Sequence, residues 1–188
     1  MSDPLPSSFY IQSALVVARN LLGARLVRVL PNGARLAGRI VETEAYHGID
    51  DLASHGHSRR TPRNLPMYGP PGHAYVYFTY GNHWLLNAVA EPTDHPSAVL
   101  IRAIEPLEGL DEMAARRPGR PPQEWTDGPG KLTQALGIDG AENRLDLTTT
   151  DGRLWIEPDA AIADDLLRTG PRIGINSAPE PWLSLPWR

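Results

Sequence analysis

The chain has 188 residues, which fits a single domain spanning 1–188, and its formal net charge at pH 7 is −4. It contains no cysteine, which excludes disulfides, thiolate zinc sites, iron–sulfur clusters and cysteine nucleophiles. The first residues lack the basic and apolar segments of a signal peptide, and no stretch approaches the ~20 apolar residues of a membrane span. We therefore expect a monomeric cytoplasmic protein with no membrane partner.

The predicted elements begin with a helix over residues 11–22. Apolar side chains recur there at helical spacing, and Gly23 follows as a stop. This spacing puts Ile11, Leu15, Ala18 and Leu22 on one face of the helix.

A hairpin is expected next. Asn32-Gly33 separates the strand-like runs 24–30 and 34–46, and this dipeptide is a strong signal for a hairpin turn. Alternation along the second strand predicts that six residues share one face: Leu36, Gly38, Ile40, Glu42, Glu44 and Tyr46.

The rest of the chain is expected to combine strands, loops and short helices. Residues 47–73 lack periodicity and predict a long loop, and such loops in compact domains are usually functional. The later elements are a hairpin over 73–90, a strand over 97–105, helices over 106–117 and 128–138, a hairpin over 146–157 and a strand over 171–175. Strands dominate, so the predicted fold class is α+β.

The second strand carries two acids that admit two interpretations. Glu42 and Glu44 are either solvated charges on an edge strand or include a buried general base. Ile40 and Tyr46, expected on the same face, favour partial burial, which raises the pKa of a carboxyl group and suits it to act as a base. Arg102, inside the apolar run 97–105, is either exposed or paired with a charge beside a site.

The hairpin over 73–90 is rich in tyrosine. Tyr75, Tyr77 and Tyr80 either follow the ordinary preference of aromatic residues for strands or offer rings that stack on nucleobases. Tyr80 directly precedes the turn at Gly81-Asn82, where a ring is better placed to wedge into a partner than to join a core.

The loop contains a basic segment, 55–64, with three arginines, two histidines and no acid. It is either a solvated surface or part of a site. His55 and His57 lack the spacing of the usual helical zinc pair, so we expect neither a metal nor a cofactor. The sequence patterns of serine hydrolases, P-loops and dinucleotide-binding folds are absent. The residues alone favour a pocket for a nucleobase or a sugar.

Five blocks, in order, resemble a known family: GRIVETEAYHG, DDLASH, RRTPRNLPMYGPPGHAYVYFTYGNHWLLN, VLIRAIEPLEGL and GPGKLTQALGI. They are similar to the alkyladenine (3-methyladenine) DNA glycosylases of the mammalian type, which also occurs in bacteria. The likeness covers about residues 9–176. It implies one α+β domain with a curved antiparallel sheet, a few surrounding helices and a protruding hairpin. It also implies that the partner is double-stranded DNA containing damaged purines, which are flipped out and excised.

The resemblance implies catalytic roles for three positions. Glu44 matches the general base that activates water. Arg102 matches the arginine that helps to hold this water, and the backbone carbonyl of Ile173 matches a second group that holds it. Lys131 is the only lysine. Because strand cleavage by glycosylases uses an amine Schiff base, we expect a monofunctional enzyme that leaves an abasic site.

The resemblance also implies contacts with the flipped base and with DNA. Tyr46 and Tyr77 match rings that stack on the base, His55 matches the histidine on its opposite side, and Asn87 matches the asparagine that obstructs the amino group of guanine. Tyr80 matches the wedge that fills the gap in the duplex. The other expected DNA contacts are Asn82, Arg59, Arg60 and Arg63.

The chain departs from the family pattern at three places. Asn82 stands where vertebrate members have methionine, the late R-F-Y block reads PWLSL at 181–185, and the segment around EPTDHP is longer. Two alternatives to an excision enzyme also stand. One is a non-catalytic binder of damaged DNA on the same scaffold. The other is a hydrolase of free nucleosides or sugars that uses Glu42 and Glu44 as an acid–base pair.

Overall fold

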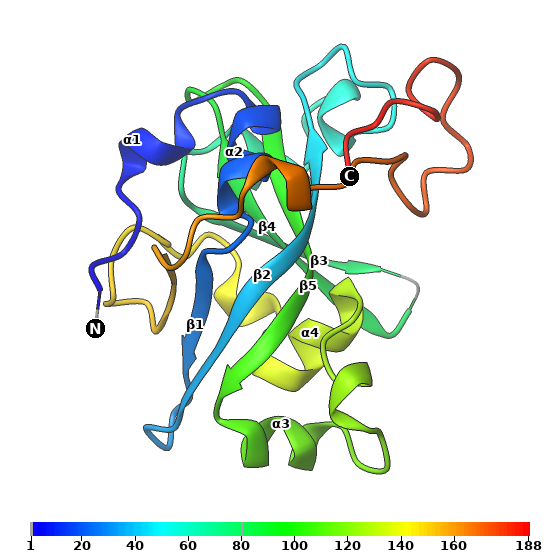
Figure 1. Ribbon diagram of the computed structural model, residues 1–188. Coiled ribbons are helices and arrows are strands. Elements are labelled where there is room, and N and C mark those ends of the chain that lie inside the picture. Colours follow the sequence, from blue (N-terminus) through cyan, green and yellow to red (C-terminus); the bar gives the residue numbers. More distant parts are fainter. Residues whose placement is uncertain (1, 80) are drawn as a thin grey trace.

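The computed structural model describes residues 2–79 and 81–188. Six strands form one antiparallel sheet, in the order β3-β4-β5-β2-β1-β6, which curls into half of a barrel (Figure 1). The strands are β1 (Arg25–Val29), β2 (Arg35–Tyr46), β3 (Ala74–Thr79), β4 (His83–Ala90), β5 (Ser97–Glu108) and β6 (Leu154–Glu157). The α+β class and the curved antiparallel sheet are confirmed.

Helices in the described residues are short. The α-helices are α1 (Ser7–Tyr10), α2 (Ala14–Leu21), α3 (Leu110–Arg116) and α4 (Pro129–Leu136). Single 3₁₀ turns are η1 (His55–His57), η2 (Leu65–Tyr68), η3 (Pro122–Glu124), η4 (Gly140–Glu142) and η5 (Asp164–Leu166). The helix predicted over 106–117 starts later because Pro106 and Glu108 still pair with β2 as part of β5.

The first predicted helix, over residues 11–22, is interrupted, and its predicted face is only partly buried: Ala18 lies in the core and Leu22 packs against it. The chain forms α1, a break and then α2, which starts after Ser13, whose side chain accepts a hydrogen bond from the Leu15 amide. The buried face carries Ala14, Val17, Ala18 and Leu21, whereas Ile11 and Leu15 are 51% and 37% exposed.

The main hydrophobic core fills the space between one face of the sheet and helices α2 and α4. Alternate residues of the central strands supply it, for example Val76 of β3, Leu86 of β4 and Ile101 of β5. A smaller cluster lies on the other face, around Met67 and Tyr75. This second face is where the long loop after β2 and the last residues of the chain lie close together (Figure 1).

Strand β2 does not alternate regularly, contrary to the prediction. Ile40 and Ala45 both belong to the main core, although they are five positions apart and a regular strand would point them to opposite faces. The register against β5 is irregular between Ile40 and Thr43, where Val41 is 52% exposed. This irregularity, typical of a β-bulge, changes which side of the strand meets the core.

The bulge decides where the two acids of β2 point. Thr43 faces α2, since its hydroxyl donates to the Ala18 carbonyl, and Glu44 therefore faces the other way. The prediction that Ile40 and Glu44 share a face is wrong. Glu42 and Glu44 do share one, because both contact the guanidinium of Arg102.

Two strands predicted near the end of the chain are absent from the described residues. The hairpin expected over 146–157 is reduced to β6, which pairs with β1, and to an isolated bridge between His73 and Asp146. Residues 171–175 form no strand, because their polar groups bond to side chains and loops instead of a ladder. Both segments contain Gly or turn residues that weaken strand pairing.

Candidate active site

Glu44 is a fully buried carboxylate on the sheet face opposite the main core. Its Oε1 accepts a hydrogen bond of 2.7 Å from the Ile173 amide, and its Oε2 accepts one of 2.9 Å from the Tyr46 hydroxyl. Nη1 of Arg102 lies 3.3 Å from Oε1. A carboxylate has about four lone-pair positions, so this arrangement leaves acceptor capacity for a water molecule.

The environment of Glu44 both raises and lowers the pKa of its carboxyl group. Burial disfavours the charged form and is the largest effect, while the Arg102 cation, the Ile173 amide and the Tyr46 hydroxyl favour it. The net result is a raised pKa, which is the direction that makes a carboxylate a better proton acceptor. The charge on Glu42 adds to this rise.

Glu42 lies beside Glu44 but has different partners. Its Oε1 accepts hydrogen bonds from Nε of Arg102 at 3.2 Å and from Nη1 of Arg188 at 2.9 Å. It is therefore the shared acceptor of two arginines, one from β5 and one at the end of the chain. Arg102, which the sequence left open as exposed or paired, is buried and paired with both acids.

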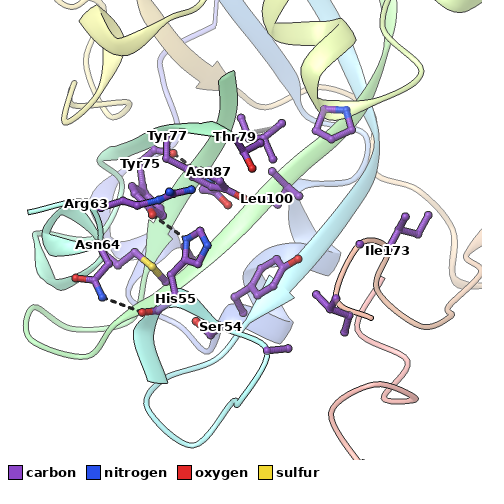
Figure 2. Close-up of a pocket in the computed structure, with 18 of the residues that line it drawn as sticks. Ser54, His55, Arg63, Asn64, Tyr75, Tyr77, Thr79, Asn87, Leu100 and Ile173 are labelled. Atoms are coloured by element: carbon purple, nitrogen blue, oxygen red, sulfur yellow. Dashed lines mark hydrogen bonds between the residues drawn. The ribbon is translucent and has the colours of Figure 1, made fainter. Parts of the chain in front are cut away.

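A pocket of about 650 Å³ is lined by the groups that contact Glu44, while the Glu44 side chain itself is fully buried behind that lining. Its size falls within the range of small-molecule sites, about 300–1,000 Å³. The pocket is lined by Tyr46, Arg102 and Ile173, which are the three groups that contact Glu44, and by parts of β3, β4, the loop around η1 and the start of α4. Figure 2 shows His55, Tyr75 and Tyr77 gathered on one side, with Ile173 facing them from the other.

Aromatic rings form one wall of the pocket. Tyr75 and Tyr77 stack with centroids 5.1 Å apart, and the His55 ring meets Tyr77 edge-on at 4.8 Å. Nδ1 of His55 is 2.9 Å from the Tyr75 hydroxyl. Partial burial and the nearby Arg63 cation lower the pKa of His55, which favours the neutral imidazole. The structure thus brings His55 and Tyr77 into contact, and Tyr46 lines the same pocket.

Asn87 of β4 lines the floor of the pocket and is 3% exposed. Its side-chain amide donates to the Tyr75 carbonyl at 3.0 Å across the β3–β4 pair. This bond fixes which end of the amide is turned toward the strand. The hydrogen bond orients Asn87, and its role in discrimination between bases, which the resemblance implies, stays a prediction.

Of the residues expected to contact DNA, Arg63 lines the pocket, and the other described ones are sequence neighbours of lining residues. Arg63 lies over the Tyr77 ring at 5.4 Å and lines the pocket, whereas Arg60 lies over Tyr68 at 4.2 Å and pairs with Asp94. Arg59 and Asn82 are exposed, and the latter is at the tip of the hairpin. The expected wedge, Tyr80, lies outside the described residues.

Comparison with known proteins identifies the family. A family model described as "Methylpurine-DNA glycosylase (MPG)" matches residues 8–188. The chain belongs to the methylpurine-DNA glycosylase family. It is 48% identical over 184 residues to a protein of Myxococcus xanthus, across 98% of this chain and 88% of that protein. It is 47% identical over 187 residues to a Bacillus subtilis protein, across 99% and 92%.

Both relatives, and a third from Carboxydothermus hydrogenoformans at 46% identity over 185 residues, carry the name "Putative 3-methyladenine DNA glycosylase". The third match covers 98% of this chain and 93% of that protein. These relatives are bacterial, so the comparisons support the family but not the mammalian-type label given to the resemblance. The family match also continues through residue 188, past the segment 181–185 that departs from the sequence pattern.

Ile173 contacts Glu44 through a group that the sequence resemblance does not mention. Its amide donates to the carboxylate, and the role of its carbonyl in holding water, which the resemblance implies, stays a prediction. The neighbour Arg172 was missed altogether. Its guanidinium is buried, pairs with Asp51 and lies over the ring of Tyr46 at 4.8 Å. No local pattern links 51 to 172, so only the fold reveals this contact.

Two further findings concern what the described residues lack. No group of three or more acidic, histidine or cysteine side chains there is arranged to hold a metal ion. None of the helices in residues 2–79 and 81–188 has the length and apolar character needed to cross a lipid bilayer.

Proposed function

We propose that this protein is a monofunctional DNA glycosylase that removes alkylated purines, 3-methyladenine and 7-methylguanine among them, from duplex DNA. Hypoxanthine and ethenoadenine are the further candidate lesions. The observation that carries the proposal is the buried carboxylate of Glu44, which lies behind a pocket walled by tyrosines and keeps acceptor capacity for water. The family and the names of the bacterial relatives support a glycosylase of alkylated DNA.

The first step in this mechanism is base flipping. A base inside a duplex is out of reach of Glu44, so it must leave the stack, at a cost of a few kcal/mol that is lower for a damaged base. The hairpin tip between β3 and β4 would enter the duplex, and Tyr80 is the expected wedge. Arg59, Arg60 and Arg63, on the loop before β3, would contact the phosphates, which carry most of the affinity for DNA.

The second step is hydrolysis of the N-glycosidic bond. Glu44 takes a proton from a water molecule as the water attacks C1′ of the deoxyribose, and the bond to the purine breaks with its electrons going to the base. Arg102, which contacts the same carboxylate oxygen as the Ile173 amide, keeps Glu44 oriented and stabilises its ionised form. The raised pKa of Glu44 favours this proton transfer.

An alkylated purine such as 3-methyladenine carries positive charge, so its glycosidic bond is already weak and needs little help from an acid. One carboxylate then suffices, in contrast to ordinary glycosidases with two. The tyrosine rings also favour a cation, by up to about 2 kcal/mol when it is desolvated. Tyr46 and Tyr77 already lie against the guanidinium groups of Arg172 and Arg63, which illustrates this preference.

The geometry disfavours the two alternatives. A hydrolase that uses Glu42 and Glu44 as an acid–base pair needs carboxylates on opposite sides of the scissile bond. Here both contact the same side chain, Arg102, and Glu42 is engaged by Arg188 as well. A binding protein needs no buried carboxylate beside its pocket, and burial of Glu44 costs stability that binding alone does not repay.

The test is an excision assay across a panel of substrates. Duplexes with 3-methyladenine, 7-methylguanine, hypoxanthine or ethenoadenine are incubated with the protein, and released bases are separated by chromatography. Free nucleosides with the same bases are the matched controls. We expect bases to be released from duplex DNA and not from nucleosides. Tight binding to damaged duplexes without release would establish a binding protein, and cleavage of nucleosides alone would establish a nucleoside hydrolase.

A further inference from the structure

A buried ion pair joins two distant parts of the chain behind the pocket. Nη1 and Nη2 of Arg172 contact Oδ2 and Oδ1 of Asp51 at 2.5 and 2.9 Å, and both side chains are fully buried. Such a two-bond contact between planar groups fixes both position and orientation. Asp51 belongs to the long loop after β2, and Arg172 to the segment that leads to the end of the chain.

The guanidinium of Arg172 also packs against two aromatic rings and donates hydrogen bonds to two backbone carbonyls. It lies between the rings of Tyr46 and Trp187, 4.8 Å from each centroid. Nη1 donates to the Ala45 carbonyl at 3.0 Å, and Nη2 to the Trp182 carbonyl at 3.3 Å. A single side chain thus holds strand β2, the long loop and the last residues of the chain against one another.

The two hydrogen-bond donors of Glu44, the Tyr46 hydroxyl and the Ile173 amide, belong to residues that directly follow Ala45 and Arg172 in the chain. Ala45, whose carbonyl Arg172 holds, lies between Glu44 and Tyr46, and Ile173 follows Arg172 directly. The Ala45 amide also donates to the Trp187 carbonyl at 2.9 Å, which adds a second link between β2 and the last residues. A shift of Arg172 would therefore displace the Ile173 amide from Oε1 of Glu44 and the Tyr46 ring from its place.

We propose that Arg172, held by Asp51, is a positioning residue that keeps the Tyr46 hydroxyl and the Ile173 amide on Glu44. The inference rests on the proposed function, because it assigns Arg172 to the orientation of the base in that reaction. It goes beyond a structural role. A buried ion pair is commonly no more stabilising than apolar residues of the same size, so stability alone gives little reason for this one.

The positioning role predicts a change in pH dependence. The groups that face Glu44 are Glu42 and Tyr46 of β2, Arg102 of β5 and the Ile173 amide. The amide and the Tyr46 hydroxyl both lower the pKa of Glu44. Their displacement would raise it, so more of the carboxyl group would be protonated at a given pH. The low-pH limb of activity would then move to higher pH.

The test compares Arg172→Lys with Arg168→Lys, a substitution of an exposed arginine in the same segment. Lysine keeps a charge for Asp51 but has neither the planar fork nor the stacking face of arginine. Single-turnover release of 3-methyladenine from methylated duplex DNA is measured across pH, together with the melting temperature. For Arg172→Lys we expect about a tenfold loss of rate below neutral pH, the effect of weakening one hydrogen bond to a charged group, and a low-pH limb at higher pH. Arg168→Lys should match the wild type.

A second variant, Trp187→Leu, leaves the ion pair in place and removes one of the two stacking rings, so it serves if Arg172→Lys does not fold. It should move the low-pH limb in the same direction by a smaller amount. The inference would be overturned if the wild-type protein is active and the low-pH limb of each variant that folds coincides with that of the wild type. No release of base by the wild-type protein would instead overturn the proposed function, and this inference with it.

Discussion

Replacement of Tyr46 by phenylalanine isolates one hydrogen bond to the proposed catalytic base. The hydroxyl of Tyr46 donates to Oε2 of Glu44 at 2.9 Å, and Tyr46→Phe deletes it while it keeps the ring that lines the pocket. A hydrogen bond to a charged group contributes about 1.5–3 kcal/mol. Since water from the pocket can replace part of this, the lower figure applies. It corresponds to about a tenfold decrease in the ionised fraction of Glu44 below its pKa.

The assay is single-turnover release of 3-methyladenine from methylated duplex DNA, measured from about pH 5 to about pH 9. This base is chosen because it is cationic and needs no further proton to leave, so the pH profile reports the ionisation of Glu44. We expect Tyr46→Phe to be about tenfold slower on the low-pH limb and equal to the wild type at high pH, where Glu44 is fully ionised in both. Tyr68→Phe is the matched control, because the Tyr68 hydroxyl bonds to the carbonyls of Gly56 and Ser58, away from Glu44. A Tyr46→Phe profile that overlays the wild type at every pH would refute the reasoning.

Three further predictions concern stability, selectivity and chemistry. Because burial raises the pKa of Glu44 above 4.5, its contribution to stability is present below that pH and is lost as pH rises through the folded pKa. The melting temperature of Glu44→Gln should therefore rise relative to that of the wild type from pH 4.5 to pH 8. The same difference in melting temperature at the two pH values would contradict the burial argument. Asn87→Ala opens the pocket floor and should raise release of guanine lesions relative to 3-methyladenine by about tenfold or less in a competition assay, whereas an unchanged ratio would remove Asn87 from discrimination. Borohydride should trap no covalent complex with DNA, because hydrolysis by a water activated by Glu44 needs no amine, although Lys131, the one lysine of the chain, lines the pocket and pairs with Asp127 at 2.9 Å; a trapped adduct would show a strand-cleaving enzyme.

Several parts of this fold followed from local sequence signals. Asn32-Gly33 and the aromatic run around Gly81-Asn82 lie in hairpins, as expected from turn chemistry. Helix α4 begins at Pro129, where a missing amide costs nothing. In each case a few neighbouring residues determine the outcome, so the sequence window contains the cause.

Other parts depended on partners that are distant in the sequence. The bulge in β2 arises in its pairing with β5, so alternation within β2 alone placed Ile40 on the wrong face. Strand β6 has β1 as its partner, and no signal within 146–157 reveals that choice. Asp51 and Arg172 meet only because the long loop and the last segment fold onto the same end of the sheet.

The candidate site shows the same division. The resemblance named Glu44, Tyr46 and Arg102, and the structure brings all of them into contact. Spacing alone left Glu42 and Glu44 equivalent. They differ in the structure because Glu44 is fully buried among donors next to the pocket, whereas Glu42 is partly exposed between two arginines.

The most direct test of the central claim is therefore to substitute each acid in turn. Release of 3-methyladenine from methylated duplex DNA is measured for the wild type, Glu44→Gln and Glu42→Gln, with a melt of each protein to establish folding. The loss of a general base predicts a fall of about 10²–10⁴-fold for Glu44→Gln. Glu42→Gln, which leaves Arg102 paired with Glu44, should stay within about tenfold of the wild type. Near-wild-type release by a folded Glu44→Gln would contradict the account.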